Sequence, residues 1–195
     1  MSVGGDTQTL SKILFASSNK NKYEEASSIL SKFGINLKFF RCELQEIQAD
    51  ALEEIAIHKV QDAFSQCRKP VIVEDDGLFI NSLNGFPGPY SSFTFKTIGI
   101  EGILNLVKKK RQATFHSVIA YCQRNRNIAL FDARVQGKIS RKPAGSKWGY
   151  DPIFIPSGQT KTYAQLKNKN LFSHRHLALK KFANWYLHKL ESSGR

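Results

Sequence analysis

The sequence lacks the cysteine spacing of a zinc site or a redox dithiol. Its three cysteines, Cys42, Cys67 and Cys122, stand far apart, so we expect them to be reduced and structural. No apolar run approaches the roughly 20 residues of a membrane-spanning helix, and we expect no membrane partner. The segment from Met1 to Gln8 lacks the apolar core of a secretory signal, which predicts a cytoplasmic location.

Acidic residues are also scarce. The 195 residues include 16 Asp and Glu against 29 Lys and Arg, which gives a formal net charge of +13. This excess indicates either an anionic partner, such as nucleic acid or a polyphosphate, or merely a solvated basic surface. The apolar share of 41% is that of a globular protein rather than a disordered one. We expect a single domain over residues 1–195, with residues 1–10 and 191–195 as flexible tails.

Short apolar runs alternate with amphipathic segments along the chain. Their spacing predicts strands at 12–16, 37–40 and 71–73, and helices at 23–33, 51–64, 101–108 and 173–190. Alternating apolar residues at 113–121 and 128–135 predict an antiparallel ribbon, and residues 137–140 extend its second strand. Another short apolar piece lies at 150–156. The turn-rich residues 84–90 should form a stiff loop. This order predicts an α/β fold with a mixed sheet.

Three of the few acids adjoin one another. Glu74, Asp75 and Asp76 directly follow the strand at 71–73, so we expect them at its exit. Adjacent like charges repel unless a cation neutralises them, and carboxylates suit hard cations such as Mg²⁺. The alternative is an acidic turn that ends the strand. A further ligand could come from one of the acids upstream: Glu46, Asp50, Glu53 or Glu54.

A polar segment between the first strand and the first helix is a candidate anion site. It consists of Ser17, Ser18, Asn19, Lys20, Asn21 and Lys22. Small polar residues there would leave backbone N–H groups free at a helix N-terminus, where the helix dipole favours an anion. The alternative is an ordinary N-cap. A Walker loop is excluded because its glycines are missing.

Two later segments carry residues that suit a nucleobase. Trp148 precedes Gly149, which permits the close approach of a ring, and a base could stack on the indole. The alternative is a turn with two core aromatics, Trp148 and Tyr150. Ser173, His174 and Arg175 open the terminal helix, where a capped helix start with a solvated arginine is the alternative.

In this order the motifs resemble those of the inosine triphosphate pyrophosphatase family, also called the Ham1-like family. The matching segments are Ser17 to Lys22, Glu74 to Leu78, Gly85 to Ser91, Trp148 to Phe154 and Ser173 to Arg175. The resemblance implies an elongated, two-lobed α/β fold with a long central mixed sheet flanked by helices. It also implies an active-site cleft between the lobes and assembly as a homodimer.

The resemblance further implies metal-dependent hydrolysis of aberrant purine nucleoside triphosphates (ITP, dITP, XTP) to the monophosphate and pyrophosphate. In that comparison Asp75 is the catalytic proton acceptor and, with Glu46, the Mg²⁺ ligand. The segment from Ser17 to Lys22 holds the triphosphate, and Lys59 and Lys169 reach phosphate or base. The expected base pocket consists of Trp148, Gly149, Tyr150 and Asp151, with His174 and Arg175 at the purine edge. Asp76 stands at a substrate-site position where the family often has Ser or Thr, and Trp148 stands where Phe is usual.

Other functions fit the sequence less well. A basic nucleic-acid-binding module would show salt-sensitive binding without turnover, but the carboxylate triplet argues against it, so we expect no stable nucleic-acid partner. Nothing supports a catalytically silent scaffold, because every expected acid and lysine is present. The related Maf-type pyrophosphatases lack the Gly-Tyr-Asp and Ser-His-Arg motifs.

Overall fold

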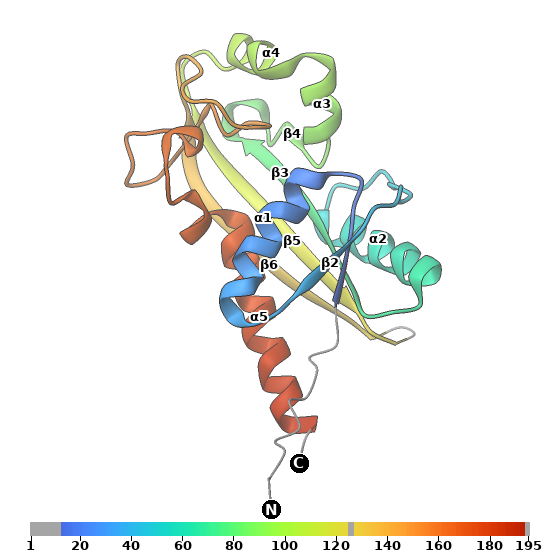
Figure 1. Cartoon of the computed structure of the whole chain (residues 1–195). Coiled ribbons are helices and arrows are strands. Elements are labelled where there is room, and N and C mark those ends of the chain that lie inside the picture. The colour runs from blue at the N-terminus through green and yellow to red at the C-terminus, as the bar shows by residue number, and fades with distance from the viewer. Residues whose placement is uncertain (1–12, 125–126, 194–195) are drawn as a thin grey trace, which may run out of the picture.

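A long mixed sheet organises the fold of the computed structural model, which describes residues 13–124 and 127–193 (Figure 1). Among these residues the sheet has seven strands in the order β2-β1-β3-β5-β6-β7, with β4 paired to β3. They are β1 (Ile13–Ala16), β2 (Leu37–Phe40), β3 (Val71–Ile80), β4 (Pro87–Gly88), β5 (Gln112–Cys122), β6 (Ile128–Ile139) and β7 (Phe154–Pro156). β1 runs parallel to β2 and β3, whereas β3, β5, β6 and β7 are antiparallel. The expected α/β fold with a mixed sheet is confirmed.

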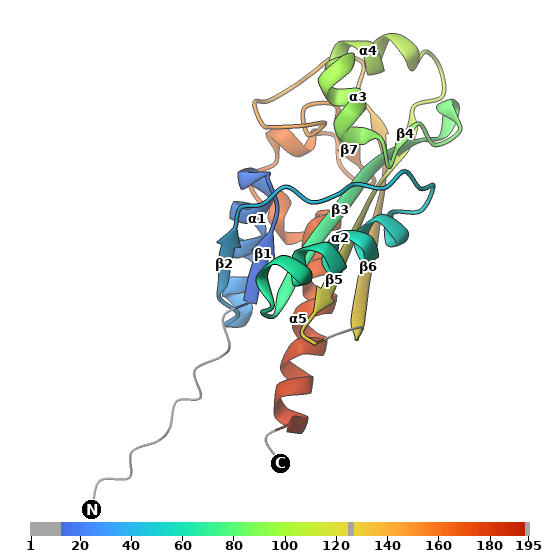
Figure 2. The ribbon, with the colours of Figure 1, turned by 90° about the vertical axis from the view of Figure 1, so that its right-hand side faces the viewer.

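Helices cover both faces of this sheet (Figure 2). They are α1 (Lys20–Leu30), α2 (Leu52–Cys67), α3 (Ser91–Thr97), α4 (Gly99–Leu106) and α5 (His174–Ser193). Ile13 and Phe15 pack into the core beneath α1 and α5, whereas Leu14 and Ala16 pack toward α2. Successive side chains of a strand point to opposite faces, which is why the short apolar run of β1 serves both cores.

Helices α3 and α4 lie at one end of the long strands, away from the C-terminal end of α5 (Figure 1). A third apolar cluster lies there and includes Leu78, Ile103 and Phe154. The predicted helix at 101–108 corresponds to α4, whereas α3 was not predicted. Its sequence has two adjacent serines and no long apolar periodicity, so its helical state depends on packing against β3 and β4.

The predicted end of the third strand at Val73 is wrong, because β3 continues through the three acids to Ile80. In a strand the three carboxylates alternate between the two faces, so they do not form one exposed acidic turn. Each face supplies a basic partner for these carboxylates: Lys59 on one face and Arg175 on the other. Buried charges are tolerated inside a strand when they are paired and hydrogen-bonded.

The turn-rich loop contains the short strand β4, which crosses close to β3. A Cβ atom on Gly77 would lie 2.4 Å from the carbonyl oxygen of Gly88, so only glycine permits this approach. Within the described residues no helix is long and apolar enough to cross a membrane. The expected tail of residues 1–10 lies outside the described residues. Helix α5 includes residues 191–193 of the expected C-terminal tail, and residues 194–195 lie outside the description.

Candidate active site

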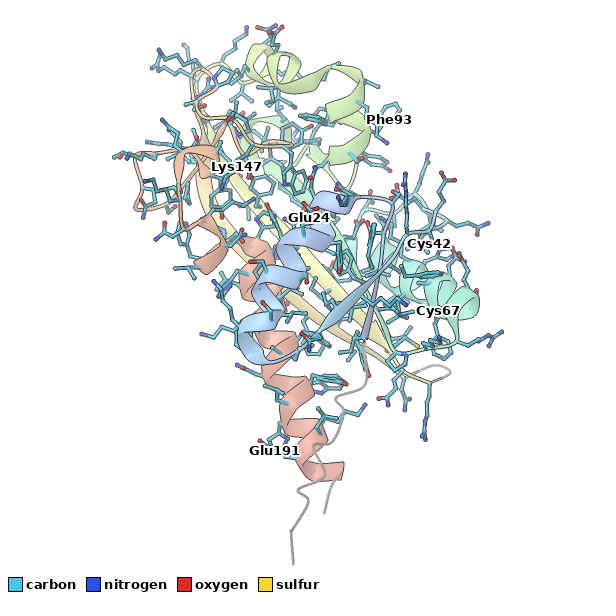
Figure 3. The ribbon with its side chains drawn as sticks, viewed as in Figure 1. Glu24, Cys42, Cys67, Phe93, Lys147 and Glu191 are labelled. Atoms are coloured by element: carbon cyan, nitrogen blue, oxygen red, sulfur yellow. The ribbon has the colours of Figure 1, made fainter. Side chains whose placement is uncertain are left out.

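A cavity of about 700 Å³ lies beside the acidic part of β3. Its walls come from residues 16–19, 21 and 22 at the start of α1, residues 42–44 and 46 before α2, and residues 148–151 after β6, together with parts of α3 and the start of α5. The cavity therefore lies between the end of the molecule that carries α3 and the part that carries α1 and α2 (Figure 1). Cys42 lies on its wall, and Cys67 is the last residue of α2 (Figure 3).

Asp75 points to the face of the sheet that α2 covers. Its Oδ1 accepts a hydrogen bond of 2.5 Å from Lys59 Nζ, and the same ammonium lies 2.7 Å from Glu46 Oε1. Burial raises the pKa of Asp75, and Lys59 and then Lys22 oppose that rise. Glu46 is the one acid among the four upstream alternatives that lines the cavity of the described structure.

Glu74 and Asp76 point to the opposite face, where the Arg175 side chain lies with 1% of its surface exposed. Arg175 Nε donates to Glu74 Oε2 at 2.7 Å, Nη2 donates to Asp76 Oδ2 at 2.9 Å, and Nη1 donates to the carboxylate of Glu25. The Ser117 hydroxyl donates to the other oxygen of Glu74 at 2.8 Å. One guanidinium thus holds three carboxylates from β3 and α1.

A lysine and a histidine complete the surroundings of Asp76. Lys22 Nζ lies 2.5 Å from Asp76 Oδ1, and His174 Nε2 lies 3.6 Å from Oδ2. Burial acts to raise the pKa of Asp76, but Lys22, His174 and Arg175 hold it well below its usual range. Burial lowers the pKa of His174, whose ring stacks on Phe115 with 4.4 Å between centroids. The imidazole is therefore neutral near pH 7.

Another part of the cavity wall combines an aromatic side chain with a buried lysine. Lys169 Nζ contacts Asp151 Oδ2 at 2.6 Å and Glu25 Oε1 at 3.1 Å. The indole Nε1 of Trp148 donates to the same Glu25 oxygen at 3.2 Å, and the Arg175 guanidinium lies 5.2 Å from the indole centre. Lys169 Nζ also lies 5.7 Å from the indole centre, so these contacts together fix the orientation of the indole.

Comparison with known proteins decides the family. The Ham1 family profile matches residues 13–185, which include every residue that lines the cavity. The chain belongs to the Ham1 family.

Relatives of this Ham1-family chain carry a common name. It is 46% identical over 180 residues to the dITP/XTP pyrophosphatase of Methanopyrus kandleri, an alignment that covers 90% of this chain and 96% of that protein. It is 42% identical to the dITP/XTP pyrophosphatase of Thermococcus kodakarensis, over 92% of this chain and all of the relative. Its fold matches a Ham1 protein from Coxiella burnetii with a TM-score of 0.77 and 30% identity, over 92% and 100% of the two chains.

The Ham1 fold brings nearly all the predicted site residues together. Every residue that the sequence placed in the site lines the cavity, with the exception of Lys20. The Lys20 side chain is 75% exposed and lies 3.3 Å from Glu24, one helical turn further along α1. Lys20 and Lys22 point in different directions because they are two residues apart on a helix.

The expectation of free backbone N–H groups near the start of α1 is wrong for four residues. The Ser17 amide donates to the Phe40 carbonyl. The Asn19 amide donates to the Ser17 hydroxyl, and the Asn21 and Lys22 amides donate to Asn19 Oδ1. Asn19 is therefore an ordinary N-cap, and the helix begins at Lys20 rather than at Tyr23. Anion binding at this end would rest on the Lys22 side chain more than on the backbone.

Sequence reasoning missed Glu25 and Phe115. Glu25 lies three residues after Lys22, a spacing that places both on one face of α1, so a helical-face argument could have found it. Phe115 is one of many apolar residues in a strand, and no local signal marks it as the residue on which His174 stacks.

Proposed function

We propose that this Ham1-family chain hydrolyses non-canonical purine nucleoside triphosphates, namely ITP, dITP and XTP, to the monophosphate and pyrophosphate. The names of its relatives support this activity. The observation that carries it is the division of the cavity. One part holds Asp75, Lys59 and Lys22, which suit phosphates, and the other presents the indole of Trp148, which suits a base.

The charge of the cavity supports a cation as cofactor. Its lining includes six carboxylates: Glu43, Glu46, Glu74, Asp75, Asp76 and Asp151. The basic lining residues are five: Lys22, Lys59, Lys96, Lys169 and Arg175. With neutral His174 these groups leave one negative charge, although the whole chain carries +13. A triphosphate brings several further negative charges, so we propose that it enters with Mg²⁺.

Asp75 and Glu46 fit Mg²⁺ by their donor chemistry. Their oxygens converge on one ammonium, that of Lys59, and Mg²⁺ is commonly held by one or two carboxylates plus substrate phosphates. When bound, the metal would polarise the phosphate and lower the pKa of water. We propose that Asp75 accepts the proton of the water that attacks the α-phosphorus, with pyrophosphate as the leaving group. Lys59 would hold both carboxylates in place and Lys22 would contact the phosphates.

A panel of nucleoside triphosphates tests the activity. Purified protein should convert ITP, dITP and XTP to equal amounts of monophosphate and pyrophosphate in the presence of Mg²⁺. ATP should turn over far more slowly, and a chelator should stop the reaction. Release of orthophosphate instead of pyrophosphate would disprove the proposed cleavage site.

Replacing Lys22 by Ala should raise the KM for ITP. A charged hydrogen bond to phosphate is worth about 1.5–3 kcal/mol, so a rise of roughly 10- to 150-fold is expected. Lys20→Ala is the matched control, because its exposed side chain does not line the cavity. Steady-state kinetics compare the two variants. Equal KM values in Lys22→Ala and Lys20→Ala would mean that this segment acts only as a helix start.

Selection of the base should depend on hydrogen bonds at the purine edge. A pocket that offers donors to the 6-oxo group accepts hypoxanthine and xanthine, whereas the amino group of adenine would leave those donors unpaired. The three guanidinium nitrogens of Arg175 each donate to a carboxylate, so we propose that Arg175 positions the site rather than reads the base. His174 and the backbone of Gly149 to Asp151 remain the proposed edge contacts.

Replacing Trp148 by Ala should weaken the binding of ITP and of ATP by a similar factor. Stacking on an aromatic face is worth roughly 1–3 kcal/mol for any base, which corresponds to about 5- to 150-fold in KM. The ratio of the two specificity constants should stay close to its wild-type value. Trp148→Phe should retain most of the affinity because it keeps a stacking face. A large change in the ratio would place discrimination in the indole itself.

We also propose a homodimer and a cytoplasmic location. Exposed apolar side chains at one end of the molecule support a dimer, since the Phe93 side chain on α3 points outward with 68% of its surface exposed (Figure 3). Ile98 and Leu106 on the neighbouring segment are also exposed. Light scattering on the purified protein measures the mass in solution.

A further inference from the structure

Three potential metal ligands gather on the α2 side of the sheet. Glu53 comes from the first turn of α2, His116 from β5 and Asp132 from β6. His116 Nε2 lies 3.5 Å from Asp132 Oδ2 and 3.7 Å from Glu53 Oε1, and the three ligand atoms all lie within 4.8 Å of one another. None of these residues is among those that line the cavity, so the cluster is separate from the site described above.

The buried imidazole of His116 lacks a hydrogen bond where the two carboxylates face it. His116 is 4% exposed, and its Nε2 has no hydrogen-bond partner among the described residues. Both carboxylates approach this nitrogen at distances longer than a normal hydrogen bond. A buried polar atom without a partner carries its full desolvation cost, and a bound ion is one of the standard explanations for it.

We propose that Glu53, His116 and Asp132 bind a divalent transition-metal ion of the zinc class. Imidazole nitrogen and carboxylate oxygen are both Zn²⁺ ligands, and imidazole suits transition metals, whereas Mg²⁺ prefers oxygen alone. Bonds of 2.0–2.1 Å in a tetrahedral site would place neighbouring ligands about 3.4 Å apart. The two distances from His116 Nε2, 3.5 and 3.7 Å, are close to that spacing, and the two carboxylates lie within 4.8 Å of each other.

The protonation state of His116 suits this role. Burial, and then Arg134, lower the pKa of His116 against the opposing effect of Glu53 and Asp132, so the ring is neutral near pH 7. A metal ligand must be the neutral imidazole, and no proton has to be removed first. The side chains of Glu53 and Asp132 are 36% and 48% exposed, so the ion can enter from solvent and keep a water as its fourth ligand.

Two cations face the cluster and would compete with the metal. Arg134 Nη2 lies 3.9 Å from Glu53 Oε1, and Lys181 Nζ lies 3.8 Å from Asp132 Oδ1. Both side chains are mostly exposed, and Lys181 Nζ also donates to the Asp132 backbone carbonyl at 2.6 Å, which leaves the Asp132 carboxylate to the ion. A bound metal would tie the first turn of α2 to β5 and β6, and should therefore stabilise the helix that carries Lys59.

Calorimetric titration with Zn²⁺, in excess Mg²⁺ to saturate hard oxygen sites, tests the proposal without measuring turnover. The wild-type protein should bind one equivalent of Zn²⁺, with an affinity that depends on His116. His116→Gln should weaken this binding by at least about tenfold, because loss of a ligand costs more than loss of a second-shell partner. His188→Gln, which removes an exposed histidine of α5, should bind as the wild type does. Equal affinity in His116→Gln and wild type would overturn the proposal.

Two further variants guard against a folding defect in His116→Gln. Asp132→Asn removes one ligand charge from a half-exposed side chain and should also weaken zinc binding. Arg134→Gln removes a competing cation and should strengthen it, a gain that misfolding cannot produce. Zinc should raise the Tm of the wild type in a concentration-dependent manner and that of Asp132→Asn much less. Unchanged affinity in both Asp132→Asn and Arg134→Gln would overturn the assignment.

Discussion

Asp75→Asn is expected to retain the fold and to lose turnover of ITP by several orders of magnitude. The change removes a proton acceptor and one charge of the proposed Mg²⁺ site together. Asn is nearly isosteric with Asp and still offers an oxygen to Lys59 Nζ. In the wild type this nitrogen lies 2.5 Å from Asp75 Oδ1. The Asp75 side chain is buried beside that lysine.

Steady-state kinetics and circular dichroism measure the two parts of this prediction. Asp50→Asn is the matched control, because Asp50 is exposed and was one of the alternative ligands, yet it does not line the cavity. Its kcat should equal that of the wild type. Retention of more than a tenth of the activity in Asp75→Asn, about 1.4 kcal/mol of barrier, would reject Asp75 as the base.

Arg175→Ala should destabilise the protein strongly. The guanidinium is buried and pairs with Glu74, Asp76 and Glu25, so its removal leaves three carboxylates without their shared partner. Breaking a buried ion pair by removing one member typically costs about 3–5 kcal/mol. Arg175→Lys should recover only part of this loss, because an ammonium cannot make the three directed bonds of the guanidinium fork.

The destabilisation of Arg175→Ala should depend on pH. Burial acts to raise the pKa of Glu25, but Arg175 and Lys169 hold it below its ordinary value of 4.5. A carboxyl with a lowered pKa contributes stability above its unfolded-state pKa, and that contribution is lost as the pH falls through its folded-state pKa. The difference in unfolding free energy between wild type and variant should therefore be full at neutral pH and shrink below about pH 4.5.

Urea unfolding at several pH values measures this difference. Arg141→Ala is the control, since Arg141 is exposed and the change should have little effect on stability. An Arg175→Ala variant as stable as wild type, but with a reduced preference for ITP over ATP, would instead support the original prediction that Arg175 reads the purine edge.

Local patterns in the sequence were sufficient to predict most elements of the fold. Apolar runs and helical spacing located β1, α1, α2, α4 and α5 to within a few residues, and alternation located the β5–β6 ribbon. These patterns are reliable because each strand or helix must bury its own apolar face whatever its neighbours are. Nearly all the site residues that the motifs and the family resemblance indicated line the cavity.

Only the tertiary structure decided how the charged residues are used. The sequence places Glu74, Asp75 and Asp76 together, but Arg175, which allows Glu74 to be buried inside β3, lies 101 residues away. Lys22 of α1 and Lys59 of α2 reach the same strand, and Glu25 of α1 pairs with Arg175. The cluster of Glu53, His116 and Asp132 likewise joins α2, β5 and β6. Charge interactions depend on distance and burial in space, and neither is encoded in the local pattern of a segment.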